Sequence, residues 1–150
     1  MKDELTLEPV RRSVEVRCSA TEAFRLFTDE IDSWWPLATH SIGGAHAEAC
    51  YFEGREGGRI YESHADGSVH LWGTVTVWEP PVRATFTWHP GRDVSTAQEI
   101  ELCFTALSEG TKVELEHRGW EALGETALRT RSAYETGWVS VLERYEVRCS

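Results

Sequence analysis

The sequence has no long apolar run and comparatively few positive charges. No stretch approaches the roughly 18 consecutive apolar residues that a helix needs to cross a bilayer, so we expect no membrane insertion. Lysine and arginine number 15 against 25 aspartate and glutamate residues, and the formal net charge is −10. Nucleic acids and anionic membrane surfaces bind positively charged proteins. The composition therefore argues against both classes of partner.

Targeting signals and paired cysteines are also missing. The N-terminal sequence MKDELTLEPV contains no apolar signal core, which favours a cytoplasmic location. No two cysteines have the CxxC spacing of a zinc site, and cytoplasmic cysteines are usually reduced. We therefore expect free thiols, some of them buried, at Cys18, Cys50, Cys103 and Cys149.

Common catalytic and cofactor motifs are absent as well. The glycine pairs fit neither GxGxxG nor GxxxxGK[ST], so no phosphate-binding loop is expected. Neither the GxSxG elbow nor the HExxH zinc motif occurs. The most metal-like grouping is His40, His46 and Cys50, but its loose spacing across a loop and a strand start favours ordinary loop and core roles. We expect neither a metal nor a cofactor.

The stretch 125–147 has the apolar spacing of a long helix, uninterrupted by proline. It would be about 35 Å long at 1.5 Å per residue. Gly137 lies in its middle, at a cost of about 1 kcal/mol relative to alanine. We therefore expect Gly137 to allow close approach of the sheet or of a ligand. The apolar face consists of Ala127, Tyr134, Trp138, Val141, Leu142 and Tyr145.

Before this helix, alternating apolar and polar residues predict a series of strands. Short glycine and proline turns join most of them, so neighbouring strands must be antiparallel. One α+β domain over residues 1–150 follows, with helices on one face of an antiparallel sheet. The predicted strands span residues 10–18, 48–53, 59–64, 69–79, 82–89, 98–107 and 111–118.

Two short helices are expected after the first strand. Ser19 has the position of an N-cap, with Glu22 three residues later at the capping-box spacing. A second short helix is expected over residues 28–35, where Pro36 ends it.

Strand parity indicates which side chains face the long helix. The last two strands alternate cleanly, which places His117 on the inward face, and Glu62 faces inward in an earlier strand. In strand 69–79 two alternating sets compete. The set that we favour as inward is Trp72, Thr74, Thr76 and Trp78.

The chain contains seven tryptophans, which predict either a well-filled aromatic core or a cavity for a hydrophobic or aromatic ligand. In a cavity, Glu62 and His117 would orient a polar group of the ligand. Alternatively, both satisfy backbone groups or buried partners. The candidate ligand-binding residues are Trp35, Glu62, Trp72, Trp78, Phe86, Trp88, His117, Tyr134 and Trp138.

Several short motifs recur in an order that resembles a known family. They are Trp34-Trp35-Pro36, Gly57-Gly58-Arg59, Asp66-Gly67, Trp72-Gly73, Pro80-Pro81, Phe86-Thr87-Trp88, Gly110-Thr111, His117, Gly119-Trp120, Tyr134, Gly137-Trp138 and Leu142. Over residues 10–147 this order resembles bacterial proteins related to the C-terminal domain of the activator of the heat-shock-protein-90 ATPase. These belong to the START-like (SRPBCC, birch-pollen-allergen-like) superfamily. The resemblance implies a helix-grip fold: a seven-stranded antiparallel sheet curved around a long C-terminal helix, with two short helices after the first strand.

The resemblance also implies a cavity between sheet and helix for hydrophobic or aromatic molecules. Members include carriers of lipids and hormones, polyketide aromatase/cyclases, antibiotic self-resistance proteins and co-chaperones, with no shared catalytic motif. We expect a protein that binds a hydrophobic small molecule. One alternative is a cyclase/dehydratase-type enzyme that uses His117 or Glu62 as acid or base. Another is a co-chaperone of the stress response, a different protein-interaction module or a homodimer, although the additional N-terminal domain of the true activators is missing from the sequence.

Overall fold

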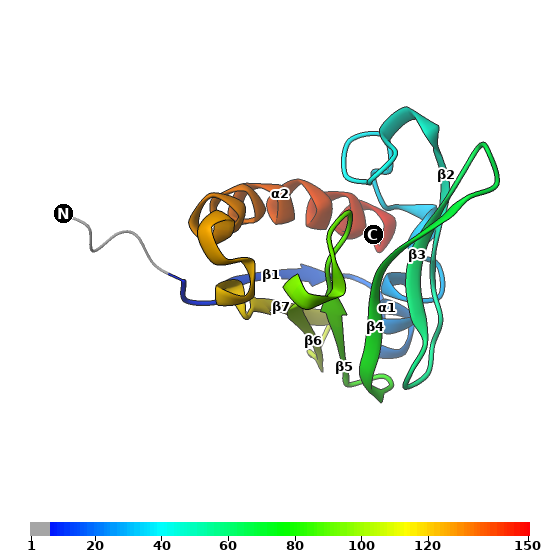
Figure 1. Cartoon of the computed structure of the whole chain (residues 1–150). Helices are drawn as coiled ribbons and strands as arrows, with labels where there is room; N and C mark the ends of the chain where they lie inside the picture. The colour runs from blue at the N-terminus through cyan, green and yellow to red at the C-terminus, as the bar shows by residue number, and fades with distance from the viewer. Residues whose placement is uncertain (1–6) are drawn as a thin grey trace.

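A seven-stranded antiparallel sheet curves around helix α2 (Ala127–Arg148) in the computed structural model, which describes residues 7–150 (Figure 1). The order of the strands across the sheet is β1-β7-β6-β5-β4-β3-β2. This is the predicted helix-grip arrangement of the α+β class. The strands are β1 (Val10–Val16), β2 (Ala47–Phe52), β3 (Arg59–His64), β4 (Val69–Glu79), β5 (Arg83–Trp88), β6 (Gln98–Ala106) and β7 (Thr111–Arg118).

Most of the N-terminal stretch on which the prediction of a cytoplasmic location depends lies outside the described residues, which begin at residue 7. From there to residue 150, no helix is long and apolar enough to cross a membrane.

Two helical segments follow β1, and only the first is an α-helix. Helix α1 (Ala20–Phe27) begins at the predicted cap, where Ser19 Oγ accepts a hydrogen bond from the Glu22 amide at 3.2 Å. The second is a 3₁₀ helix (Ile31–Ser33), which is shorter than the helix expected over residues 28–35. Too few residues separate the end of α1 from the following proline for a run of α-helical hydrogen bonds.

Helix α2 begins slightly later than the sequence predicted. The segment before it, Trp120–Thr126, is 3₁₀-helical and contains Gly124 at φ 61° and ψ −126°. This backbone region is favourable essentially for glycine alone. The α-helix therefore begins at Ala127 rather than at residue 125.

The predicted alternation of β6 and β7 is confirmed. Their register pairs Ile100 with His117 and Leu102 with Leu115, and all four side chains are buried on the inward face. On the outer face, Arg118 forms ion pairs with three glutamates of the same two strands. One face of this half of the sheet is thus core and the other is solvated.

Strand β4 follows neither of the alternations that the sequence suggested. Trp72 is buried and Trp78 is half-buried against the core, but the buried residues between them are Gly73 and Val75, whereas Thr76 is exposed. The register of β4 shifts once against β3 and once against β5. Because an irregularity of this kind changes which residues face inward, the prediction of Thr76 as an inward residue was wrong.

Aromatic side chains close the space between α1 and the C-terminal part of α2. Phe27 packs edge-on against Trp34 and Tyr145, with ring centroids 4.9 Å away in each case. Tyr145 Oη also donates a hydrogen bond to the Ala23 carbonyl at 2.7 Å. The aromatic-core alternative therefore holds for this part of the molecule.

The four cysteines are free thiols, as predicted. The structure also shows a contact that the sequence did not predict, because Cys18 Sγ lies 2.7 Å from Cys149 Sγ. It joins the segment after β1 to the residue that follows α2.

Candidate functional site

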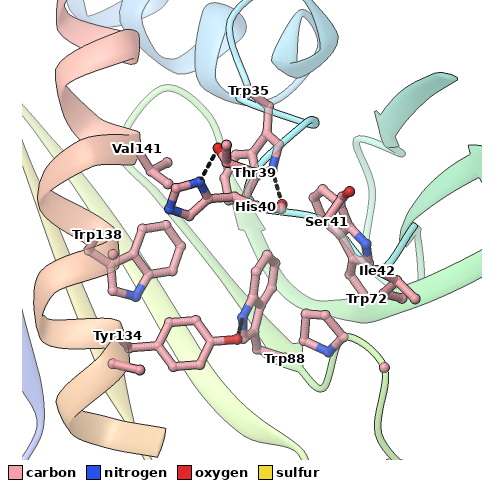
Figure 2. A pocket seen from close by; sticks show the side chains of 14 residues that line it. Trp35, Thr39, His40, Ser41, Ile42, Trp72, Trp88, Tyr134, Trp138 and Val141 are labelled. Carbon is pink, nitrogen blue, oxygen red and sulfur yellow. Dashed lines mark hydrogen bonds between the residues drawn. The ribbon is translucent and has the colours of Figure 1, made fainter. Parts of the chain in front are cut away.

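A pocket of about 450 Å³ lies between the sheet, the middle of α2 and the loop that follows Trp35 (Figure 2). This volume is within the range of small-molecule sites. The lining residues are Trp35, Thr39, His40, Ser41, Ile42, Trp72, Trp88, Pro90, Gly91, Ala133, Tyr134, Gly137, Trp138 and Val141.

Three parts of the fold position these side chains. On α2, Tyr134, Trp138 and Val141 are spaced by four and three residues, so one face of the helix presents all of them. Trp72 on β4 and Trp88 on β5 form the sheet side, with ring centroids 5.5 Å apart. Pro90 and Gly91, shortly after β5, extend the sheet side, and the loop that connects the 3₁₀ helix to β2 supplies the remaining wall.

The four tryptophans that line the pocket share one property: each indole N–H donates a hydrogen bond to another group of the protein. A buried tryptophan whose polar atom is already satisfied presents only its apolar ring to a neighbour. The parts of the wall that the tryptophans form are therefore apolar, and polar groups come from the loop. The bonds are Trp35 to the His40 carbonyl at 2.7 Å, Trp72 to Glu62 Oε1 at 2.6 Å, Trp88 to Tyr134 Oη at 3.0 Å and Trp138 to His117 Nδ1 at 3.0 Å.

Glu62 is fully buried behind this wall and accepts four hydrogen bonds. The amides of Ile42 and Gly43 each donate at 2.8 Å, and His64 Nε2 and Trp72 Nε1 each donate at 2.6 Å. Burial opposes the charge, but the bonds from Ile42, His64, Gly43 and Trp72 hold the pKa of Glu62 below its usual value. Glu62 is a carboxylate that fixes the pocket loop to β3.

His117 is also fully buried and is not one of the residues that line the pocket. Nδ1 accepts the Trp138 N–H at 3.0 Å, and Nε2 donates to Gln98 Oε1 at 3.1 Å. The Trp120 ring stacks on the imidazole at 4.0 Å. Burial lowers the pKa of His117 to about 3, so a neutral imidazole holds Trp138 in place.

The family model described as Activator of Hsp90 ATPase homolog 1-like protein matches residues 17–146. The chain belongs to this family. The match covers every residue that lines the pocket, and it confirms the resemblance found in the sequence motifs. Among curated proteins, none matches the chain.

Solved structures extend this family comparison. Txn09, named as an anthrahydroquino-γ-pyrone synthase complexed with SUM, is 33% identical, with a TM-score of 0.60 over 85% of this chain and 87% of that chain. The Aha1 dimer from Colwellia psychrerythraea is 15% identical, with a TM-score of 0.69 over 94% and 95% of the two chains. MLL2253 from Mesorhizobium loti is 18% identical, with a TM-score of 0.68 over 92% and 93%. The last two likenesses show the fold alone.

Some of the predicted site residues of this family member lie away from the pocket. Trp78 follows Trp72 by six residues on β4, about 20 Å along an extended strand, and packs against Phe24 with ring centroids 5.0 Å apart. Phe86 lies beneath Trp88 in the core, with ring centroids 5.9 Å apart. Glu62 accepts a hydrogen bond from Trp72 and His117 accepts one from Trp138, but neither lines the pocket. The structure thus brings Trp35, Trp72, Trp88, Tyr134 and Trp138 together around the pocket and leaves the other candidates outside its lining.

The sequence reasoning missed the polar residues that the loop contributes, above all Thr39 and His40. Loop residues follow no periodicity, so parity could not place them. Gly137 was expected to allow close approach of the sheet or of a ligand. A Cβ at Gly137 would lie 3.9 Å from His40 Nε2, an ordinary contact distance, so among the described residues nothing approaches closely enough to require a glycine, and approach of a ligand stays a prediction. Within residues 7–150, no group of three or more His, Cys, Asp and Glu side chains is arranged to hold a metal.

Replacing Gly137 by alanine is expected to stabilise the protein by about 1 kcal/mol, because alanine has the higher helix propensity and its Cβ would make only an ordinary contact with His40. Urea unfolding monitored by circular dichroism measures this difference. The matched control is Gly124→Ala, which is expected to destabilise the fold because Gly124 has a positive φ of 61°. A loss of stability in Gly137→Ala would show that the gap at this position is needed.

Proposed function

We propose that the protein binds a planar, largely apolar aromatic molecule in the pocket between α2, the sheet and the loop after Trp35. The observation that carries this proposal is that all four indole N–H groups donate hydrogen bonds to other groups of the protein. The tryptophans therefore present their aromatic rings to the pocket. Flat rings pack well against such faces. The relative Txn09 supports the same ligand class, because its name denotes a product with a fused aromatic ring system.

Polar recognition inside the pocket comes from few groups. Tyr134 Oη accepts the Trp88 N–H at 3.0 Å, which leaves its own proton available for a ligand. Burial raises the pKa of Tyr134, and the Trp88 bond and the charge of Arg92 only partly offset this, so the hydroxyl stays protonated at neutral pH. A ligand with an acceptor oxygen on an aromatic frame matches this arrangement.

Tryptophan fluorescence tests the binding directly. Titration with 1-hydroxyanthraquinone is expected to give saturable quenching with a dissociation constant of roughly 10 μM, or about −7 kcal/mol. A flexible aliphatic ketone of similar size is expected to bind much more weakly, because it cannot stack. Quenching by the quinone that does not saturate would contradict the proposal.

Two leucine variants show whether the ligand occupies this pocket. Gly137→Leu places a side chain into the pocket beside His40 and is expected to weaken binding at least about tenfold, the scale of 1–2 kcal/mol. Ser140→Leu makes a matched change on the exposed side of the same helix and is expected to bind normally. Equal affinity in the two variants would place the ligand elsewhere.

A second candidate is a ring-forming enzyme, and the 33% identity to a named synthase favours it. Glu62 and His117 are poorly placed for the acid or base role first assigned to them. Glu62 accepts four hydrogen bonds, and both ring nitrogens of His117 are engaged.

The predicted co-chaperone role, homodimer and cytoplasmic location stay predictions.

A further inference from the structure

Two thiols that are far apart in the sequence meet where the end of α2 reaches the start of α1. Cys18 lies between β1 and α1, and Cys149 directly follows α2. Their sulfur atoms are 2.7 Å apart. The S–S bond of a disulfide is about 2.05 Å long, so the two sulfurs need to approach by only about 0.7 Å to form one. The pair therefore lies within reach of a covalent bond.

Contacts that do not involve the thiols hold both residues in place. The Thr111 hydroxyl donates a hydrogen bond to the Cys18 carbonyl at 2.9 Å. At the end of α2, Arg148 donates hydrogen bonds to Glu30 at 3.0 Å and to Ser33 at 3.1 Å. Because each thiol is positioned by its own neighbours, the fold keeps the two sulfurs together without a bond between them.

The two thiols differ in their access to solvent. Cys18 is partly exposed, whereas Cys149 is buried. Burial and the adjacent Cys18 thiol raise the pKa of Cys149 to about 12, so Cys149 is protonated at neutral pH. A small oxidant in solution therefore reacts first with Cys18, and Cys149 is the neighbouring thiol that completes the reaction.

We propose that Cys18 and Cys149 form a reversible disulfide, with a low-molecular-weight disulfide as the oxidant. The Cys18 thiolate attacks one sulfur of the oxidant, breaks its S–S bond, releases one thiolate and leaves a mixed disulfide on Cys18. Cys149 loses its proton, attacks Cys18 Sγ and releases the second thiolate. Two protein thiols are oxidised and one small disulfide is reduced to two thiols, which take up the two protons that the protein loses.

The remaining thiols have no such partner. Cys50 is buried on β2, and Cys103 is partly exposed on β6. Three strands separate β2 from β6 in the sheet. Within residues 7–150, no other two thiols are in contact. The link is therefore specific to one pair, and it would join the end of α2, the helix that forms one wall of the pocket, to the start of α1.

Equilibration in mixtures of reduced and oxidised glutathione tests the proposal. After acid quenching, alkylation in denaturant is expected to modify four cysteines in the reduced protein and only Cys50 and Cys103 in the oxidised protein. The folded protein should form the link with an equilibrium constant at least about 100-fold larger than the urea-unfolded chain, because the fold already holds the sulfurs together. By thermodynamic linkage the same factor stabilises the oxidised fold, which should raise its melting temperature by about 5 to 10 °C.

Three serine variants identify the pair. Cys103→Ser removes a partly exposed thiol without a partner and is the matched control, so it should form the link as the wild type does. Cys149→Ser should stop at the mixed disulfide of glutathione on Cys18, and Cys18→Ser should take up little glutathione, with circular dichroism confirming that both are folded. Four free thiols throughout the wild-type titration would overturn the proposal. So would linked peptides that contain Cys50 or Cys103, or equal linking constants in the folded and unfolded chains.

Discussion

Glu62→Gln is expected to lower the free energy of unfolding by about 3 kcal/mol, although the change removes only a charge from a fully buried side chain. The carboxylate accepts four donors, and an amide offers one oxygen and two N–H groups of its own. At least one donor must then face another donor, so buried polar groups are left without acceptors. The loss should show in urea unfolding at neutral pH.

The pocket loop is expected to loosen in the same variant. Two of the four donors are the amides of Ile42 and Gly43, and both are expected to exchange slowly only while they are hydrogen-bonded to Glu62. Hydrogen exchange at these amides should therefore accelerate more than exchange in β6 and β7, and affinity for 1-hydroxyanthraquinone should fall. Glu53→Gln, directly after β2, is the control, because Glu53 accepts from the Arg59 amide at 2.8 Å at a partly exposed site and is expected to lose much less. If both loop amides in Glu62→Gln exchange as slowly as in the wild type, Glu62 is not the group that holds the loop.

The regular parts of the fold were predictable because burial imposes a period on them. The inward row of β6 and β7, with Leu102, Leu115 and His117, follows strict alternation, and the structure buries all three. The same reasoning failed for strand β4, where it placed Thr76 on the inward face. Its two register shifts arise from pairing with β3 and β5, and pairing partners are not visible in the alternation of a single strand.

The site was predictable only where it is built on those regular elements. Tyr134 and Trp138 were found from helical spacing, and Trp72 and Trp88 from strand parity. His40 was not found, because its position depends on where Glu62 anchors the loop. Alternation shows that a side chain faces inward, but it cannot distinguish a residue that lines a pocket from one that supports the lining. For this reason Glu62 and His117 were predicted to contact the ligand.

His117 should make the protein sensitive to mild acid. Its pKa in the folded state is lowered to about 3 from 6.5 by burial, and a second proton on the ring would point Nδ1–H at the N–H of Trp138. Between these two pKa values the unfolded chain binds more protons, so stability is complete above pH 6.5 and falls as the pH drops through this window. At pH 5 the loss is expected to be about 2 kcal/mol, from about 1.4 kcal/mol per pH unit. Urea unfolding at pH 7, 6 and 5 measures it.

The variant His117→Gln separates this effect from other acid titrations. Glutamine carries no titratable proton, so its stability should change much less between pH 6.5 and 5, even if it starts from a lower value at neutral pH. The contribution of Glu62 does not interfere, because its pKa in the folded state lies below the 4.5 of a free glutamate and its stabilisation is lost only under more acidic conditions. Equal slopes in the wild type and in His117→Gln would mean that His117 is not the group that couples folding to pH. Since burial keeps the pKa of His117 in the folded protein at about 3, the imidazole that accepts the Trp138 N–H stays neutral over this interval, and binding of 1-hydroxyanthraquinone to the folded protein should stay level while the stability falls.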